Sequence, residues 1–326
     1  TAAINAHEGR KVVTVDIPGA FMHCDIDEEI FIKLDGAMAQ LLTKVDHDKY
    51  TPYLKQENGK PVMYVRLLKA LYGTLQAALL FWEELSGYLT NELGFTTNPY
   101  DTCVVNKMIN GRQCTALWHV DDIKISHHDQ SVLDEIVDQL SGRYGKEAPL
   151  TVTRGPIHEY LGMTIDYSEK GKVKFIMTDY IEGILDEAPC DMDGTAITPA
   201  GNNLFSVNPD AEPLDDEKSE IFHRLTAKLL YLCKRSRPDF QTVVSYLTTR
   251  VTKSDVDDWK KLGRAIKYLR AEKHRWLTLE VGDDLCIKWW VDASFAVHPD
   301  MRSHTGATMS LGKGSPISFS RKQKIN

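Results

Sequence analysis

Two adjacent aspartates, Asp121 and Asp122, directly follow an apolar stretch at residues 116–120. Like charges at neighbouring positions repel each other, and a tight turn does not require both of them. A divalent cation such as Mg²⁺ removes this conflict, because it prefers hard carboxylate oxygens as ligands. Taken alone, the pair is explained better by a polar hairpin turn than by a metal site.

A third aspartate, Asp16, favours the metal site. It ends an expected buried strand at residues 11–17, where an unpaired carboxylate would be costly. If this strand lies beside the expected hairpin at 113–126, three carboxylates converge. Such a set suits two-metal phosphoryl or nucleotidyl transfer, in which one metal activates the attacking oxygen and the other stabilises the leaving group. The alternative interpretation of Asp16 is a polar residue in a turn.

The elements that would position these aspartates indicate an α+β fold. Alternating apolar residues and turn signals such as Asn110-Gly111 predict strands, and apolar residues at helical spacing predict helices. The expected strands of this first block are 11–17, 30–34, 61–67, 102–109, 113–120, 123–126, 157–167 and 172–177, and its helices are 74–93 and 130–142. The helix 74–93 is expected to bury one face that carries Leu75, Ala78, Leu79, Trp82, Leu85, Leu89 and Leu93.

The pattern changes at residues 189–214, a proline-containing stretch that predicts a long connection. Helices are then expected at 215–234, at a segment with Pro238 in its first turn, and at 255–272 with Ser254 as its N-cap. Three closing strands are expected at 285–293, 304–311 and 316–320.

The bulk composition limits the class of protein. The chain has 326 residues, 42% of them hydrophobic, which is enough for two or three domains with cores. A net charge of −7 argues mildly against nucleic-acid binding but does not exclude it, because only the contact groove must be positive. Six scattered cysteines without zinc-ligand spacing indicate reduced thiols inside a cell. No apolar run is long enough for a membrane span, and the start has neither a signal peptide nor an initiator Met, so we expect a piece of a longer chain.

Several motifs, in chain order, resemble those of copia-type retrotransposon reverse transcriptases. One such motif alone would be weak, but the set runs along nearly the whole chain at fitting spacing. The segments are 16–33 (polymerase motif A), 68–82 (motif B), 119–122 (motif C), 160–163 (primer grip), 231–239 (a signature after the palm) and 289–296, 302–306 and 316–323 (opening strands of RNase H).

The resemblance implies an RNA-directed DNA polymerase that uses two Mg²⁺ ions, for which Mn²⁺ can substitute. Asp16 and Asp121 would hold both ions with help from the backbone carbonyl of Ile17, and Asp122 would be the third carboxylate. Phe21 falls at the family's steric gate against a ribose 2′-OH and would favour dNTPs. The alternative interpretation of Phe21 is ordinary core packing.

Further site residues are implied by the same resemblance. Gly73 and Gln76 would line the nucleotide pocket, although a turn glycine and an exposed helix start explain them equally well. Asp292 would be the first RNase H carboxylate, or simply a polar strand residue. The residues expected to position the primer end are Tyr160, Leu161, Gly162 and Met163.

The chain also departs from the family pattern. His119 replaces the usual Tyr of motif C, which leaves primer handling in doubt, and Ala78-Leu79 replace the usual Pro-Arg of motif B. The family's fingers strands are expected before residue 1 and the later RNase H carboxylates after residue 326. We therefore expect no RNase H activity, because one carboxylate cannot hold two metals.

The resemblance predicts four parts. They are a palm of antiparallel sheet with helices on one face and part of the fingers (1–188), a linker (189–214), a helical thumb or connection (215–280) and a truncated RNase H-like sheet (281–326). The implied partners are an RNA template, a DNA primer or RNA–DNA hybrid, and dNTPs, with no membrane, and a homodimer is left open. The implied location is intracellular, in cytoplasmic virus-like particles or the nucleus.

Two other functions compete with an active polymerase. A catalytically inactive remnant could retain the fold as a nucleic-acid or protein interaction module. An unrelated two-metal nuclease gives no reason for Phe21, Gln76 and the Tyr160 hairpin. Lys260 and Arg264, together with Lys267, form a basic stripe that could follow a phosphate backbone, although a solvated helix face is at least as good an explanation.

Overall fold

The computed structural model describes residues 1–324, which form two compact units. One unit is Thr14–Thr153. The other combines Thr1–Val13 with the chain from Arg154 onwards. Each unit has its own sheets and helices, and all six cysteines are free. The predicted division into four parts stays a prediction.

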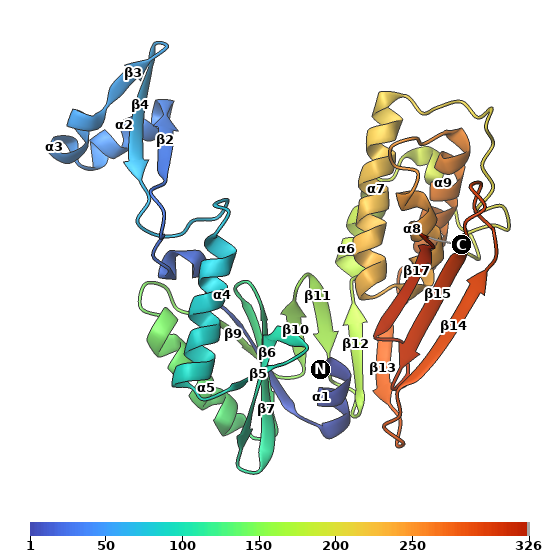
Figure 1. The fold of residues 1–326 in the computed structure, drawn as a ribbon, viewed down its shortest axis with the longest axis horizontal. Helices are drawn as coiled ribbons and strands as arrows, with labels where there is room; N and C mark the ends of the chain where they lie inside the picture. The colour runs from blue at the N-terminus through green and yellow to red at the C-terminus, as the bar shows by residue number, and fades with distance from the viewer. Residues whose placement is uncertain (325–326) are drawn as a thin grey trace. The chain divides into compact units, whose positions relative to one another are not determined.

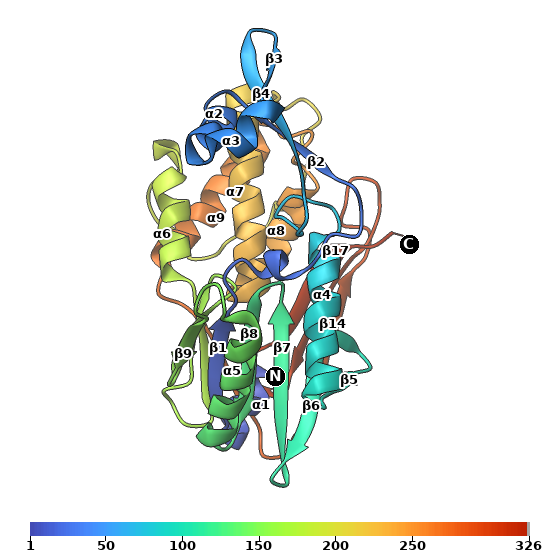
Figure 2. The same ribbon diagram turned by 90° about the vertical axis from the view of Figure 1, so that its left-hand side faces the viewer.

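The first unit is built on an antiparallel sheet with strand order β5-β6-β7-β8-β1-β9. Helices α4 (Ala77–Gly87) and α5 (Gln130–Tyr144) cover the same face of it (Figure 2). The buried ring of Tyr144 packs edge-on against Phe81 and joins the two helices. The strands are β1 (Lys11–Asp16), β5 (Thr96–Asn98), β6 (Asp101–Ile109), β7 (Arg112–His119), β8 (Asp122–His127) and β9 (Thr151–Arg154), and the unit boundaries fall within β1 and at the end of β9.

A second, three-stranded sheet in this unit has the order β2-β4-β3 (Figure 1). It consists of β2 (Phe31–Asp35), β3 (Lys55–Glu57) and β4 (Lys60–Arg66), with α2 (Gly36–Val45) and α3 (His47–Tyr50) in the connection. The chain on either side of this sheet is joined by backbone hydrogen bonds. Ala70 N–H donates to the Cys24 carbonyl at 3.0 Å, and Ile26 N–H donates to the Leu68 carbonyl at 3.2 Å. These bonds hold the segment after β1 beside the segment before α4.

The second unit contains the helix α1 (Ala2–Glu8), a sheet with order β10-β11-β12-β13-β16, and a group of helices (Figure 1). The strands are β10 (Ile157–Tyr160), β11 (Met163–Asp166), β12 (Lys172–Ile176), β13 (Leu277–Val281) and β16 (Gly312–Lys313). The helices α6 (Thr178–Glu187), α7 (Asp216–Arg235), α8 (Gln241–Thr248) and α9 (Val256–Ala271) share one apolar core. Fully buried members of that core are Phe222, Leu225, Leu229, Val244, Leu262 and Ile266.

A final sheet of this unit has the order β14-β15-β17. Its strands are β14 (Lys288–Ser294), β15 (His304–Ser310) and β17 (Ile317–Lys322). Every residue of the edge strand β14 is exposed, and its Trp289 and Trp290 side chains are 51% and 53% exposed. The opposite edge strand, β17, is tied to α8 by a hydrogen bond from Ser320 to Thr242.

Several sequence expectations are corrected by the structure. The strand predicted at 157–167 is two strands, β10 and β11, joined by a turn at residues 161–162. The N-cap of α9 is Asp255 rather than Ser254, because the Asp255 carboxylate accepts the N–H groups of residues 257 and 258. Strand β13 was not predicted, since it is defined by its long-range pairing with β12 and β16.

The helix predicted at 74–93 begins later than expected, and only the later part of the predicted face is buried. Its α-helical part is α4, followed by a π-helical turn at Tyr88–Glu92. Leu75, Ala78 and Leu79 are exposed, whereas Leu85 and Leu89 are buried as predicted. Phe81, which was not predicted to face inward, is also buried. No helix within residues 1–324 has the length and apolar character needed to cross a membrane.

Candidate functional site

The end of β1 lies beside the β7–β8 turn, where the three predicted carboxylates are. β8 is the sheet neighbour of both β1 and β7. The backbone N–H of Ile17 donates to the carbonyl oxygen of Asp121 at 3.4 Å. This contact fixes the residue after Asp16 to the turn that carries Asp121 and Asp122. The structure therefore brings together the three aspartates that the sequence selected.

The electrostatics of the cluster follow from how these carboxylates lie. Partial burial, followed by repulsion from Asp121, raises the pKa of Asp16 above its ordinary value. Partial burial and repulsion from Asp121 and Asp16 likewise raise the pKa of Asp122, against an opposing effect of His119. His119 faces Asp122 across the β7–β8 ladder. Neighbouring carboxylates that include two with raised pKa values, Asp16 and Asp122, are a suitable donor set for a hard cation.

The turn between β7 and β8 is held in an uncommon backbone conformation. Val120 has a φ of 58°, in the left-handed region. A β-branched residue is a genuine outlier there, and such strain costs roughly 1–3 kcal/mol. The strained residue directly precedes Asp121-Asp122, so the fold maintains an unfavourable conformation where the two carboxylates are presented.

Tyr72 is a site residue that the sequence analysis missed. Its hydroxyl donates to Asp121 Oδ2 at 2.6 Å, and its ring centroid lies 4.3 Å from that of Phe21. Burial, reinforced by the bond to Asp121, raises the pKa of Tyr72 to about 12 even though half of its surface is exposed. Tyr72 lies inside the segment assigned to motif B, but only the three-dimensional contact with Asp121 identifies it.

Phe21 lies in a short 3₁₀ helix (Ala20–His23) that follows β1. Its side chain is 6% exposed and contacts Phe81 as well as Tyr72. This burial agrees with core packing and also with a ring that limits the space beside the carboxylates. The role of Phe21 as a steric gate stays a prediction.

Gly73 and Gln76 lie in the turn that leads into α4. Gly73 has a φ of 97°, which other residues rarely adopt. Gln76 Nε2 donates to Glu28 Oε1 at 2.7 Å. The other amide atom of Gln76, Oε1, is buried and has no hydrogen-bond partner in the described chain. A buried acceptor without a donor is uncommon in native structures, so a bound group could satisfy it.

The donor atoms of the three aspartates suit a metal ion, but their present arrangement does not. Their hard oxygens and mutual repulsion suit Mg²⁺. Within residues 1–324, however, no group of three or more His, Cys, Asp or Glu side chains is arranged to hold a metal ion. One oxygen of Asp121 is engaged by the Tyr72 hydroxyl. Ligation would therefore require side-chain rotation and exchange of this hydrogen bond.

The predicted primer-grip residues form a tight turn in the other unit. Tyr160 pairs with Met163, while Leu161 and Gly162 both have positive φ values, of 51° and 70°. The hydroxyl of Tyr231 on α7 donates to the Leu161 carbonyl at 3.0 Å. A Cβ atom at Gly162 would lie 2.8 Å from that hydroxyl, so a glycine is required. Two motifs that the sequence analysis treated separately are thus joined here.

Asp292, the predicted first RNase H carboxylate, lies on the exposed strand β14 of the same unit. Its carboxylate accepts the N–H of Ala293 at 2.9 Å. Its predicted role in RNase H chemistry stays a prediction.

Comparison with known proteins assigns the family. The family model described as reverse transcriptase (RNA-dependent DNA polymerase) matches residues 1–201, more than half of the chain. A putative transposon Ty5-1 protein of Saccharomyces cerevisiae is 22% identical over 309 residues, which cover 95% of this chain and 92% of that protein.

Two plant relatives are much longer than this chain. The retrovirus-related Pol polyprotein from transposon TNT 1-94 of Nicotiana tabacum is 22% identical over 96% of this chain, and that from transposon RE2 of Arabidopsis thaliana is 25% identical over 95%. The chain spans only 22% and 19% of their respective lengths. The chain belongs to the reverse transcriptase (RNA-dependent DNA polymerase) family and corresponds to the reverse transcriptase region of copia-type retrotransposon Pol polyproteins.

Proposed function

We propose that this chain transfers nucleotides from dNTPs to a primer 3′-OH on an RNA or DNA template, as part of a retrotransposon Pol polyprotein. The observation that carries the proposal is the meeting of Asp16, Asp121 and Asp122 at one end of the sheet, in a chain of this family. Such a polymerase would act on RNA–DNA hybrids inside virus-like particles.

Asp16 and Asp121 are the residues that would hold two Mg²⁺ ions, together with the Ile17 carbonyl, and Asp122 would be the third carboxylate. When bound, the ions supply activation of the attacking hydroxyl and stabilisation of the leaving pyrophosphate. The protein's contribution is to bring the carboxylates together in a fixed turn. Tyr72 orients the Asp121 carboxylate through its 2.6 Å hydrogen bond.

The nucleotide side of the site is formed by residues around Tyr72. The packed rings of Phe21 and Tyr72 would limit the space available to a ribose 2′-OH, which favours dNTPs. The buried Gln76 Oε1 offers an acceptor to a donor group of the nucleotide, and the turn at Gly73 leaves that face open.

The remaining parts of the proposal concern the rest of the chain. The turn at residues 160–163 would support the primer end, because Tyr231 fixes its backbone. The six-stranded sheet would be the palm, the helices α7–α9 the thumb or connection, and β14, β15 and β17 the start of an RNase H-like sheet. Asp292 on β14 would be the first carboxylate of an RNase H site.

The test is dTTP incorporation on poly(rA)/oligo(dT) in Mg²⁺ and, separately, in Mn²⁺. The unaltered chain is compared with Asp121→Asn and with Asp138→Asn as a matched control. Asp138 is an exposed aspartate of α5 in the same unit, so it undergoes the same chemical change away from the cluster.

Incorporation that is lost in Asp121→Asn and kept in Asp138→Asn would support the polymerase. Equal activity in all three proteins would exclude Asp121 as a metal ligand. No incorporation by the unaltered chain, combined with binding of the RNA–DNA hybrid, would favour the non-catalytic nucleic-acid module instead.

A further inference from the structure

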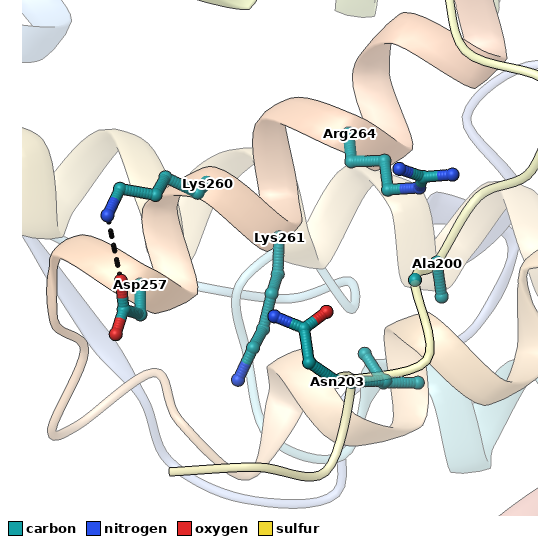
Figure 3. A pocket seen from close by; sticks show the side chains of 8 residues that line it. Ala200, Asn203, Asp257, Lys260, Lys261 and Arg264 are labelled. Carbon is teal, nitrogen blue, oxygen red and sulfur yellow. Dashed lines mark hydrogen bonds and ion pairs between the residues drawn. The ribbon is translucent and has the colours of Figure 1, made fainter. Parts of the chain in front are cut away.

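A partly open pocket of about 220 Å³ lies between α9 and the linker segment 198–206 (Figure 3). Helix α9 contributes Asp257, Lys260, Lys261 and Arg264 to its wall. The pocket belongs to one compact unit, and none of its residues has a role in the proposed nucleotidyl transfer.

Two cationic side chains attach the linker segment to the helix. Arg264 Nη2 donates to Thr198 Oγ1 at 2.9 Å, near one end of the segment. Lys261 Nζ donates to the Ser206 carbonyl at 2.6 Å, at the other end. Between them, the buried side chain of Leu204 anchors the segment in the helical core. The pocket is therefore a fixed feature of the fold rather than a gap beside a loose loop.

The pocket wall carries an excess of positive charge. Three cations face one carboxylate, Asp257, which is paired with Lys260 at 2.9 Å. Lys261 lies 3.8 Å from the buried Asp258 below it. Arg264 has no carboxylate partner within residues 1–324, and its hydrogen bond goes to a neutral hydroxyl. Because Lys260 and Arg264 are four residues apart on the helix, their like charges also repel each other.

We propose that this pocket binds one phosphate group. The Arg264 guanidinium has N–H groups left beyond its bond to Thr198, and its planar fork matches the oxygens of a phosphate. Lys260 adds a flexible positive charge, and the Asn203 amide lies at the opposite wall. The volume is below the roughly 300–1,000 Å³ of pockets that enclose a drug-sized ligand, so the pocket suits a single phosphate better than a whole nucleotide.

A phosphate group could come from two sources. One is the backbone of a bound nucleic acid, and this version rests on the proposed function. The other is a free phosphate or pyrophosphate, which is independent of that function. A phosphate pocket and a basic stripe on α9 predict different effects of substituting Lys267, because Lys267 belongs to the stripe but does not line the pocket.

The experiment compares the full chain with Arg264→Gln and Lys267→Gln. Both substitutions remove one positive charge from α9, but only the first alters the pocket. Lys261 is left intact because it holds the linker segment. Pyrophosphate binding is measured by calorimetry. Binding of a fluorescein-labelled RNA–DNA hybrid is measured by anisotropy at several salt concentrations.

We expect Arg264→Gln to weaken pyrophosphate binding by about fivefold or more, and Lys267→Gln to leave it within about twofold. If the natural ligand is a backbone phosphate, Arg264→Gln also weakens hybrid binding and lowers the slope of log K against log salt by about 1. An effect on pyrophosphate binding alone would identify free phosphate or pyrophosphate, rather than a nucleic-acid backbone, as the source of the phosphate group.

If Arg264→Gln and Lys267→Gln weaken binding equally, the proposed phosphate pocket is wrong and a diffuse basic stripe explains the binding. Absence of pyrophosphate binding, or an unchanged affinity in Arg264→Gln for both ligands, would overturn the pocket as well. If the unaltered chain does not bind the RNA–DNA hybrid at all, this result counts against the proposed polymerase function. The pyrophosphate measurement still tests the proposed phosphate pocket in that case. Lys260→Gln replaces Arg264→Gln if loss of the bond to Thr198 lowers the melting temperature.

Discussion

Each unit of the protein contains neighbouring aspartates, but their surroundings differ. On α9, Asp258 is 1% exposed and accepts hydrogen bonds from Arg250 Nε at 2.7 Å and from the Tyr246 hydroxyl at 3.1 Å. Asp255 caps the helix and pairs with Arg250 at 2.9 Å. These carboxylates are neutralised by the fold itself.

Asp16 at the end of β1 and Asp121 at the β7–β8 turn lack such compensation. Within residues 1–324, neither Asp16 nor Asp121 forms an ion pair with a basic side chain, and Asp121 is held by the neutral hydroxyl of Tyr72. The two regions show what separates a structural carboxylate from a candidate ligand. The fold places a basic side chain beside the structural carboxylate. The candidate ligand has no such partner, so a bound cation would have to stabilise it.

The largest expected effect is loss of catalysis in Asp121→Asn. We expect polymerase activity to fall by on the order of 10³-fold or more, because an amide is a poor ligand for Mg²⁺ and removes charge where pyrophosphate leaves. The melting temperature should not fall, since Asp121 has no structural ion pair. A drop in melting temperature comparable with the loss of activity would place Asp121 with the structural carboxylates.

For Asp258→Asn we expect a loss of stability, the result that is not expected for Asp121→Asn. Removing one partner of a buried ion pair leaves the Arg250 charge uncompensated, so we expect the free energy of unfolding to fall by about 3 kcal/mol. Urea titration followed by circular dichroism measures this change. The control is Asp257→Asn, an exposed neighbour that should change stability by less than about 0.5 kcal/mol. Equal stability of the two variants would contradict the comparison.

A smaller effect is expected at Tyr72. Tyr72→Phe removes the hydrogen bond to Asp121 but keeps the ring against Phe21, so we expect incorporation to fall by about tenfold through kcat, with KM for dTTP almost unchanged. Tyr72→Ala also removes the ring and should increase incorporation of ribonucleotides. If Tyr72→Phe retains full activity, the hydroxyl does not position Asp121.

The smallest expected effect is a gain in stability in Asp122→Asn. Burial and repulsion raise the pKa of Asp122 in the folded state, so the folded protein favours the protonated form. The unaltered protein therefore loses stability as pH rises from the ordinary carboxyl range through this raised pKa. The neutral Asn avoids that loss, and we expect a gain of about 0.5 kcal/mol at pH 7.

This gain should shrink as the pH falls through the raised pKa of Asp122 into the ordinary carboxyl range, because the unaltered carboxyl becomes protonated. Melting curves at several pH values measure it, with Asp138→Asn as the control that changes nothing. A loss of stability in Asp122→Asn at pH 7 would show that the carboxylate is compensated in the folded state.

Much of the site could be predicted because its signals are local. A carboxylate at the end of an expected buried strand and two more at a hairpin turn suggested that Asp16, Asp121 and Asp122 would meet if the strand lay beside the hairpin, and the family resemblance supported this. The strand pairing around Asn110-Gly111 was predicted for the same reason, and β6 and β7 confirm it.

The features that were missed depend on contacts distant in sequence. Tyr72 reaches Asp121 across 49 residues, and nothing in its neighbours marks it as a site residue. The turn at Leu161-Gly162 was missed because Leu rarely adopts a positive φ, and the bond from Tyr231 that holds it is 70 residues away. Strand β13 likewise depends on its pairing with β12. Local patterns carry no information of this kind.

The exposed edge strand β14 has a consequence for the behaviour of the chain in solution. Its unpaired backbone groups run beside Trp289, Trp290 and Val291, all of which are at least half exposed. An open edge with large apolar side chains is a template for pairing with another extended chain. Lys288 and Asp292 place charges along this edge, which opposes such pairing but does not block it. The chain by itself is therefore expected to aggregate through this edge at high concentration, well before either unit unfolds.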